Sequence, residues 1–382
     1  MTKVNTKVMS GFVELSPTHQ AIFDTAKKIV REVYERRGYQ NTDTPAIERT
    51  EVLLSKSGGE TEKQIYYIDK DGHDRDMALR FDLTVPFARY VAGHYGELKF
   101  PFKRCQVEKV WRGERAQKGR YREFYQADVD VVAEGDLPLA YDADIIATLA
   151  EALGKLTGTF GLGRFKIRLS NREVWTDAGL KQLPEIMALV DRRLKMSADE
   201  FDAELSKLPE ADKVKKILYD NGKDHAALGE VYDLLKSAGV PVEIDVSIVR
   251  GLDYYTGTVF ETFLDEHPGL GSIASGGRYA NLVGDFMGRN IIGVGGSIGL
   301  SRSFVPLIEE GAITMPTAGR TVIIPKTPEQ NKAAFLLAGS IPATAIYTNK
   351  EVKKPLELAA KHGANRAIIV NDDGTTTEKE LT

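Results

Sequence analysis

The segment from Val110 to Val132 constrains the fold more than any other part of this chain. Its sequence is Val-Trp-Arg-Gly-Glu-Arg-Ala-Gln-Lys-Gly-Arg-Tyr-Arg-Glu-Phe-Tyr-Gln-Ala-Asp-Val-Asp-Val-Val, with apolar and aromatic residues towards both ends. Alternating apolar and polar residues are typical of strands, whereas the middle of the segment contains glycine and many charges. The pattern therefore predicts two strands joined by a cationic loop.

The predicted loop carries five cations within eleven residues, namely Arg112, Arg115, Lys118, Arg120 and Arg122. These groups repel one another unless an anion neutralises them, and the guanidinium fork matches the bidentate geometry of phosphate. The alternative is an exposed basic turn surrounded by water. Polar side chains that alternate out of a strand share one face, which favours a binding site. That face would carry Glu114, Gln117, Glu123, Gln126, Asp128 and Asp130.

Length and composition indicate an ordinary globular protein of two or three domains, with 382 residues, 42% hydrophobic and 28% charged. Apolar runs stay well short of the roughly 20 residues that span a bilayer, so we expect no membrane contact. The N-terminal residues do not form a secretory signal, and the one cysteine, Cys105, permits no intrachain disulfide. These features predict a reducing, cytoplasmic location.

The expected elements form a mixed α and β pattern. An amphipathic helix begins at Ser16-Pro17 and ends at Gly38. The remaining expected elements of the main part are a short strand at 39–45, a hairpin of 64–68 and 77–81, a helix at 138–156, strands at 165–169, 242–249, 259–263 and 292–297, and a helix at 300–308. Residues 171–240 are helical and highly charged, which predicts an insertion between strands.

The C-terminal part is predicted to be a separate small domain. Glycine and proline cluster in 311–318, which indicates a linker. Residues 319–382 then alternate strand, helix, strand, helix, strand, a pattern that implies a mainly parallel sheet.

Common signatures of nucleotide and metal sites are missing from the sequence. No Gly-x-x-x-x-Gly-Lys-Ser/Thr loop occurs, and Gly161-Leu-Gly163 and Gly293-Val-Gly295 lack the third glycine of a dinucleotide loop. One cysteine and six scattered histidines give no zinc pattern, so no metal site is predicted. Phosphate binding must therefore come from side chains.

Four further segments contain the components of a closely lined pocket. They are Arg250-Gly-Leu-Asp-Tyr-Tyr-Thr-Gly-Thr-Val-Phe-Glu261, Ser275-Gly-Gly-Arg-Tyr279, Gly293-Val-Gly-Gly-Ser-Ile-Gly-Leu-Ser-Arg302, and the stretch from Leu79 to Tyr90 with Asp82 and Thr84. Glycines allow close backbone approach, and tyrosines offer an apolar wall with a polar tip. The alternatives are plain turns, a glycine-rich strand packed on a helix, and a helix start capped at Thr84.

Taken in order, these strings resemble the histidyl-tRNA synthetase family of class II synthetases over roughly residues 9 to 310. The segments that resemble the class II motifs are the helix ending in Gly38-Tyr39 with Thr44-Pro45, Arg112-Gly-Glu-Arg with Gly119-Arg-Tyr-Arg-Glu-Phe-Tyr-Gln126, and Gly299-Leu-Ser-Arg302. The segments that resemble strings peculiar to the histidine enzymes are Arg250-Gly-Leu-Asp-Tyr-Tyr255 and Gly276-Gly-Arg-Tyr279.

The resemblance implies an α+β fold with an antiparallel catalytic sheet flanked by helices. The catalytic core would comprise 1–170 and 241–310, a helical insertion 171–240, a linker 311–318, and an anticodon-binding-like α/β domain 319–382. With 64 residues, that last domain is shorter than is usual in the family. A homodimer is also implied.

The resemblance also implies a reaction, in which histidine and ATP, with Mg²⁺, give histidyl-adenylate that then acylates tRNA(His). Carried over by position, Arg112 and Arg250 would be catalytic, and Arg112, Glu114, Arg120 and Arg302 would bind ATP. The histidine-binding residues would be Asp82, Thr84, Gln126, Asp130, Arg250, Tyr254, Tyr255 and Tyr279. Arg250 would neutralise charge growing on the α-phosphate.

Two other functions remain open at this point. One is a non-catalytic paralogue that senses histidine as the regulatory subunit of ATP phosphoribosyltransferase. The other is an adenylating enzyme whose acceptor is not tRNA. The presence of all the phosphate-facing arginines and both histidine strings favours the synthetase.

Overall fold

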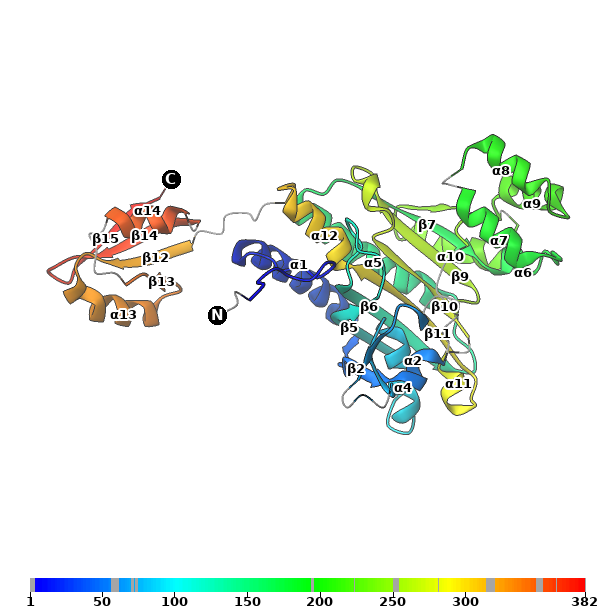
Figure 1. Ribbon diagram of the computed structural model, residues 1–382, viewed down its shortest axis with the longest axis horizontal. Coiled ribbons are helices and arrows are strands. Elements are labelled where there is room, and N and C mark those ends of the chain that lie inside the picture. The colour runs from blue at the N-terminus through cyan, green and yellow to red at the C-terminus, as the bar shows by residue number, and fades with distance from the viewer. Residues whose placement is uncertain are drawn as a thin grey trace. The chain divides into compact units, whose positions relative to one another are not determined.

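The structure of the chain is a computed structural model that describes residues 4–55, 62–69, 72, 75–193, 196–222, 224–249, 254–280, 282–313, 320–347, 353–361 and 363–381. The chain divides into two compact units, Met1–Ile313 and Thr314–Thr382 (Figure 1). In the described part, no helix has the length and apolar character needed to cross a membrane.

The first unit is built on an eight-stranded sheet with the order β1-β5-β6-β11-β10-β9-β7-β8. Neighbouring strands are antiparallel except in the two edge pairs, β1 with β5 and β7 with β8. The predicted antiparallel sheet is confirmed. The strands are β1 (Gln40–Asn41), β5 (Phe102–Trp111), β6 (Glu123–Glu134), β7 (Phe165–Asn171), β8 (Val242–Ile244), β9 (Thr258–Leu264), β10 (Ala274–Tyr279) and β11 (Ile291–Gly299).

Three long helices pack on the sheet through their apolar sides: α1 (Pro17–Arg36), α5 (Ala140–Phe160) and α12 (Leu300–Glu309). Helix α1 begins as predicted, because the Ser16 side chain accepts a hydrogen bond from the His19 amide at 3.3 Å. Helix α5 ends at Gly161, whose φ of 66° suits a residue without a Cβ. Buried leucines and isoleucines of α5 close the core beneath the central strands.

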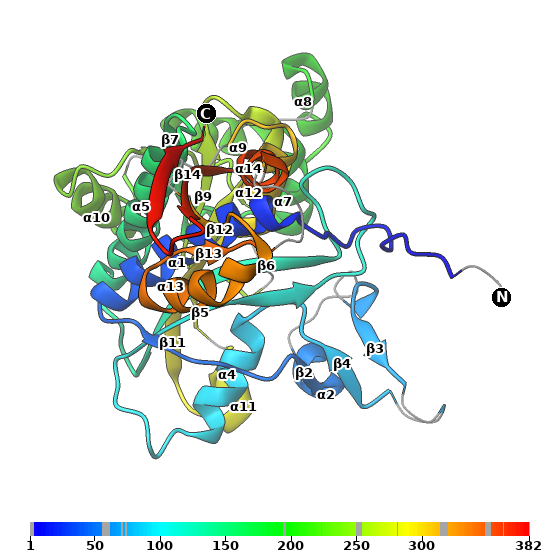
Figure 2. The same ribbon diagram turned by 90° about the vertical axis from the view of Figure 1, so that its left-hand side faces the viewer.

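A smaller three-stranded sheet lies beside the main one, with the order β2-β4-β3. It comprises β2 (Ile47–Arg49), β3 (Tyr66–Ile68) and β4 (Met77–Leu79), and the predicted hairpin is confirmed as the antiparallel β3–β4 pair. Figure 2 shows this sheet next to α2 (Thr50–Leu54), with α4 (Thr84–Gly93) close to α11 (Gly284–Met287). Helix α4 matters for function because its first turn borders the cavity described below.

The segment predicted to be an insertion is helical, as expected. It contains α6 (Glu173–Thr176), α7 (Leu183–Arg192), α8 (Ala198–Leu205), α9 (Ala211–Asp220) and α10 (Ala226–Ser237). Ser197 and Glu200 form a capping box at the start of α8.

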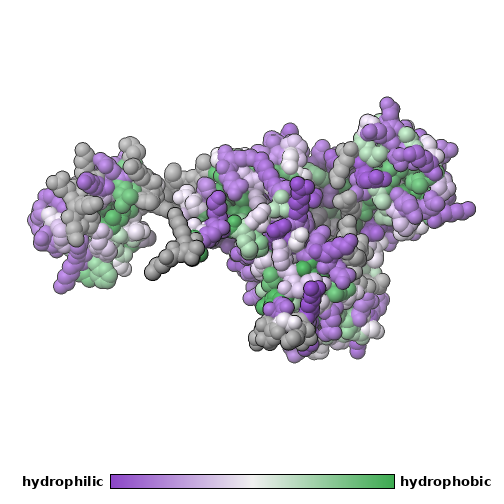
Figure 3. Space-filling view, viewed as in Figure 1, coloured by the Kyte–Doolittle hydropathy of each residue, from purple (hydrophilic) through white to green (hydrophobic). Residues whose placement is uncertain are grey.

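Hydrophilic residues predominate on the visible face of the first unit (Figure 3).

The second unit has a four-stranded sheet with the order β13-β12-β14-β15, in which β12 pairs in parallel with β13 and β14. Its elements are β12 (Arg320–Pro325), α13 (Asn331–Ser340), β13 (Thr344–Ala345), α14 (Lys353–Lys361), β14 (Ala364–Val370) and β15 (Thr376–Glu380). Two short 3₁₀ turns are also present, Pro268–Leu270 in the first unit and Pro328–Gln330 in the second. Val322 and Ile324 pack with Ala359 of α14, whereas Ile323 packs with Ala334 of α13. Both faces of the sheet are therefore covered.

Four details differ from the sequence-based expectation. The strand expected at 242–249 ends at Ile244, because the Asp245 carboxylate accepts a hydrogen bond from the Ser247 amide and starts a turn. The strand expected at 39–45 covers two residues. Two strands were not expected, namely β10, for which a plain turn and a wall of the cleft were both open, and β15, which pairs antiparallel with β14.

Candidate active site

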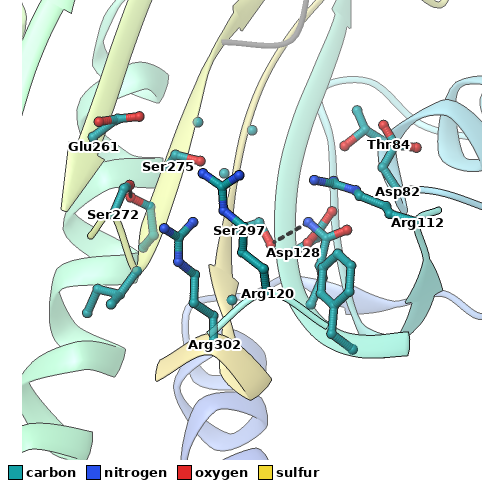
Figure 4. Close-up of a pocket in the computed structure, with 18 of the residues that line it drawn as sticks. Asp82, Thr84, Arg112, Arg120, Asp128, Glu261, Ser272, Ser275, Ser297 and Arg302 are labelled. Carbon is teal, nitrogen blue, oxygen red and sulfur yellow. Dashed lines mark hydrogen bonds between the residues drawn. The ribbon is translucent and has the colours of Figure 1, made fainter. Parts of the chain in front are cut away.

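The first unit contains a cavity of about 610 Å³ above the central strands of the large sheet. Figure 4 shows Arg120 and Arg302 side by side, and Arg112 next to Asp82 and Thr84. Eleven of the predicted site residues line it: Asp82, Thr84, Arg112, Glu114, Arg120, Gln126, Asp130, Tyr254, Tyr255, Tyr279 and Arg302. Arg250, the other predicted residue, lies outside the described residues.

The cationic loop between β5 and β6 doubles back on itself, which brings its start and end together. The Arg112 amide donates to the Arg122 carbonyl at 2.9 Å, and Gln117 and Arg120 exchange backbone hydrogen bonds across Gly119. The five cations then take different positions. Arg112, Arg115 and Arg120 line the cavity, whereas Lys118 pairs with Glu310 and Arg122 bonds to the Glu114 carbonyl.

Backbone carbonyls and aromatic rings fix the arginines that face the cavity. Arg112 Nε donates to the Phe81 carbonyl at 3.0 Å, and its guanidinium lies 5.2 Å from the centre of the Phe124 ring. Arg302 Nε donates to the Leu270 carbonyl at 2.9 Å. In each case the remaining N–H groups stay available for a ligand, because a guanidinium has five donors.

These arginines share one electrostatic environment. Glu114 lies 4.0 Å from both Arg112 and Arg120. Burial lowers the pKa of Arg302, and the neighbouring charge of Arg120 lowers it further. Cations that depress each other's charged form favour binding of a polyanion between them. The predicted phosphate-facing role of this side is thus compatible with the observed geometry.

Carboxylates form another part of the cavity lining, next to Arg112. Asp82 is buried; its Oδ1 accepts a hydrogen bond from the Val85 amide at 3.0 Å, and its Oδ2 accepts one from the Tyr254 hydroxyl at 3.5 Å. Burial raises the pKa of Asp82 to about 6. The alternative interpretation of a helix start capped at Thr84 is wrong, because Thr84 is the first residue of α4 and its N-cap residue, Leu83, makes no side-chain cap.

Tyrosines enclose the space next to these carboxylates. The Tyr254 ring meets Tyr255 at 5.0 Å and Tyr279 at 5.9 Å between centres, both in edge-to-face geometry. The Tyr279 hydroxyl donates to Asp130 Oδ1 at 2.9 Å. This corner can hold a small planar ring with polar groups on its edge.

One face of β6 supplies the floor of the cavity through Gln126, Asp128 and Asp130, as alternation along a strand requires. In the pairing with β11, Gly295 lies opposite Asp130 and Ser297 opposite Asp128. A Cβ on Gly295 would lie 2.0 Å from Asp130 Oδ1. Glycine at this position therefore makes room for the carboxylate. Gly296 instead faces Leu149 of α5, which is the alternative predicted for this glycine-rich strand.

Two residues of this region were not among the predicted site residues. Arg104 on β5 is completely buried, with Nη2 2.7 Å from Asp130 Oδ2 and 4.0 Å from Asp128 Oδ2. Asp128 lines the cavity itself. Alternation along β6 placed Asp128 on the same face as Asp130, whereas Arg104 is one of three Lys or Arg residues of β5 and gave no comparable signal.

The comparisons with known proteins agree with this geometry. The family profile described as Histidyl-tRNA synthetase matches residues 11–302. The chain belongs to the histidyl-tRNA synthetase family. The predicted family and the α+β class II fold are thereby confirmed.

Full-length relatives support the same assignment. The chain is 40% identical to the histidine–tRNA ligase of Clostridium acetobutylicum, over 99% of this chain and 95% of that protein. It is similar to the solved histidyl-tRNA synthetase of Nostoc sp. PCC 7120, with 30% identity, a TM-score of 0.83, and coverage of 99% of this chain and 97% of that one.

A third comparison concerns the alternative function. A Bacillus halodurans structure described as an ATP phosphoribosyltransferase regulatory subunit/histidyl-tRNA synthetase matches with a TM-score of 0.76, over 94% of this chain and 97% of that one. Its identity to this chain is 20%, so the likeness shows a shared fold. The ligases at higher identity favour the synthetase function.

Proposed function

We propose that this chain is a histidine–tRNA ligase, which activates histidine with ATP and transfers it to the 3′ end of tRNA(His). One observation carries the proposal: a single cavity is lined both by four arginines and by carboxylates with tyrosines. A polyphosphate fits the arginines, and an amino acid with an ammonium group and an aromatic ring fits the carboxylates and tyrosines.

The residues act by holding charges in place rather than by exchanging protons. Arg112 would bind the α-phosphate, Glu114 the adenine, and Arg120 and Arg302 the outer phosphates. Arg112 and Arg250 would stabilise the charge that grows on the α-phosphate as the histidine carboxylate attacks. Fixed donors of this kind contribute on the order of 3 kcal/mol each to transition-state stabilisation. No general base is needed, because the attacking carboxylate is ionised at neutral pH.

On the amino-acid side, Asp82, Thr84, Gln126 and Asp130 would bind the ammonium group of histidine. Tyr254, Tyr255 and Tyr279 would enclose the imidazole. The half-buried Gln126 side chain supports this assignment, since Nε2 donates to Ser297 Oγ at 3.1 Å while the buried Oε1 has no hydrogen-bond partner within the protein. A substrate N–H would satisfy that oxygen.

Mg²⁺ fits the phosphate side as a companion of ATP. Glu114 and Glu261 line the cavity beside the arginines and supply carboxylate oxygens, which are the donors Mg²⁺ prefers together with substrate phosphates. Bound there, the ion would neutralise phosphate charge. Among the described residues, no cluster of three His, Cys, Asp or Glu side chains forms a protein-only metal site.

The remaining proposals concern partners and location. We assign the second unit to anticodon binding, because an α/β unit follows the catalytic unit as the family pattern implies. Nine Lys/Arg against seven Asp/Glu in 319–382 give it a net charge of about +2, a modest attraction for RNA. We also propose that the chain forms a homodimer and acts in the cytoplasm. Deleting 314–382 should leave adenylate formation intact and weaken tRNA charging; unchanged charging would refute the RNA-binding role.

Transfer of labelled histidine to tRNA tests the ligase function. The purified chain should charge a tRNA pool in a reaction that requires ATP and Mg²⁺, and periodate-oxidised tRNA should accept no label. Histidine binding without charging, together with activation of a phosphoribosyltransferase, would support the regulatory alternative instead. Adenylate formation without charging would support an acceptor other than tRNA.

A further inference from the structure

Three buried carboxylates lie close together at the histidine side of the cavity. Asp82, Asp128 and Asp130 are each at least 98% buried there, and Arg104 is the buried cation that contacts them among the described residues. Arg112 also acts on Asp82 through its charge, and the buried Arg80 acts on Asp128. A buried carboxylate oxygen is nevertheless costly unless it accepts a hydrogen bond.

The partners of these groups show which carboxylate is left over. Asp130 forms an ion pair with Arg104, whose Nη2 lies 2.7 Å from Oδ2. Its Oδ1 accepts a hydrogen bond from the Tyr279 hydroxyl at 2.9 Å. Asp82 faces Tyr254 and the start of α4, next to Thr84, where the substrate ammonium is assigned. Asp128 lies 4.0 Å from Arg104, beyond hydrogen-bond distance.

Asp128 also has an unused acceptor. Its Oδ1 is buried and has no hydrogen-bond partner within the protein. Figure 4 places Asp128 between Ser297 and Asp82, within the cavity. A buried carboxylate oxygen in that state calls for an N–H or O–H from a ligand.

We propose that Asp128 selects the doubly protonated imidazolium ring of histidine, accepting one of its N–H groups while the tyrosines enclose the ring. The imidazolium then supplies the hydrogen bond that Asp128 Oδ1 lacks within the protein. An aromatic enclosure is favourable for a cationic ring, because the ring faces attract positive charge. This inference rests on the proposed ligase function and concerns the form of its substrate.

The charged and titratable neighbours of Asp128 are consistent with this role. Burial raises the pKa of Asp128 to about 7, and the carboxylates of Asp130 and Asp82 raise it, whereas Arg104 and a hydrogen bond from Ser297 lower it. The charge of Asp128 also acts on Tyr34 of α1, Tyr255 and Arg80. A free histidine ring has its pKa near 6.5, so ring and carboxyl compete for one proton close to neutral pH.

The protonation state of the bound histidine ring tests the imidazolium proposal directly. Histidine labelled with ¹⁵N in the ring is bound to the full chain at pH 8, where the free ring is neutral. The chemical shifts of both ring nitrogens should be those of protonated nitrogens. One unprotonated nitrogen in the bound ring would overturn the proposal, and this result needs no variant.

Substitution provides a second measurement. Asp128→Asn should weaken histidine binding by at least about tenfold and leave one bound ring nitrogen unprotonated. Its affinity for 1,2,4-triazolylalanine, whose ring is far less basic, should change much less. Asp136→Asn removes an exposed carboxylate beyond the end of β6. This control should leave the affinities for both ligands unchanged. Equal weakening of both ligands by Asp128→Asn would also contradict the proposal.

Failure of the inference and failure of the ligase function give different results. Histidine-dependent pyrophosphate exchange is measured on the same wild-type sample. Exchange together with a neutral bound ring would overturn the imidazolium proposal and leave the ligase function standing. Absence of both binding and exchange would refute the ligase function itself.

Discussion

Arg104 Nη2 lies 2.7 Å from Asp130 Oδ2, and both side chains are buried within the main sheet. Arg104 also donates to the Leu83 carbonyl at 3.0 Å and stacks over Phe87, 4.4 Å from the ring centre. One side chain therefore links β5, the carboxylates under the cavity and the segment that leads into α4. The histidine side of the cavity depends on this buried cation for its arrangement.

Removing the charge of Arg104 should damage both folding and histidine binding. Arg104→Met leaves Asp130 without its cation, and breaking a buried pair costs about 3–5 kcal/mol. Urea unfolding should show that loss, and KM for histidine should rise more than KM for ATP. Arg104→Lys, which retains a charge, should recover part of the stability. An unchanged ratio of the two KM values would contradict a specific role at the histidine side.

Gly295→Ala should disrupt the floor of the cavity. The new Cβ would lie 2.0 Å from Asp130 Oδ1, so the carboxylate or the strand must move. Overpacking of this kind costs about 1–3 kcal/mol, and we expect histidine affinity to fall with it. Gly154→Ala is the matched control, because its Cβ meets nothing within 4 Å on the exposed side of α5. That substitution should stabilise the protein by up to about 1 kcal/mol.

The buried carboxylates predict a specific pH dependence of stability. Burial raises the pKa of Asp128 from 3.8 to about 7 and that of Asp82 to about 6. The native state therefore binds more protons than the unfolded state between about pH 4 and pH 7. The free energy of unfolding contributed by Asp128 falls as pH rises through this window, by at most about 1.4 kcal/mol per pH unit.

Urea midpoints between pH 4.5 and pH 7.5 measure this effect. The stability of the wild type relative to Asp128→Asn should fall steadily with rising pH, because asparagine does not titrate. A constant difference across the window would mean that Asp128 ionises as freely in the folded protein as in the unfolded chain.

Arg302→Ala should raise KM for ATP more than KM for histidine. Losing a charge-assisted hydrogen bond to phosphate costs about 1.5–3 kcal/mol, which corresponds to a rise in KM for ATP of roughly 10- to 150-fold. Arg289, which pairs with Glu134 at 3.2 Å on the surface, provides a charge-matched control. Arg289→Ala should leave both KM values unchanged. A comparable rise in KM for histidine with Arg302→Ala would argue against the assignment to ATP.

Much of the arrangement could be predicted from the sequence because its signals are local. Alternation along β6 predicted one shared polar face, and Gln126 and Asp130 of that face line the cavity. Ser16-Pro17 marked the start of α1. What could not be predicted depends on contacts between distant segments. Arg104 acquires its role from a carboxylate on the next strand, and β10 is a strand because β9 and β11 pair with its glycines on both sides.

Pyrophosphate exchange measured for each amino acid in turn tests the central claim most directly, namely that one cavity joins an ATP site to a histidine site. The account predicts that histidine alone supports exchange of label between pyrophosphate and ATP, and that Arg302→Ala and Asp82→Asn each reduce the rate. Exchange supported by a different amino acid, or none with histidine, would contradict it.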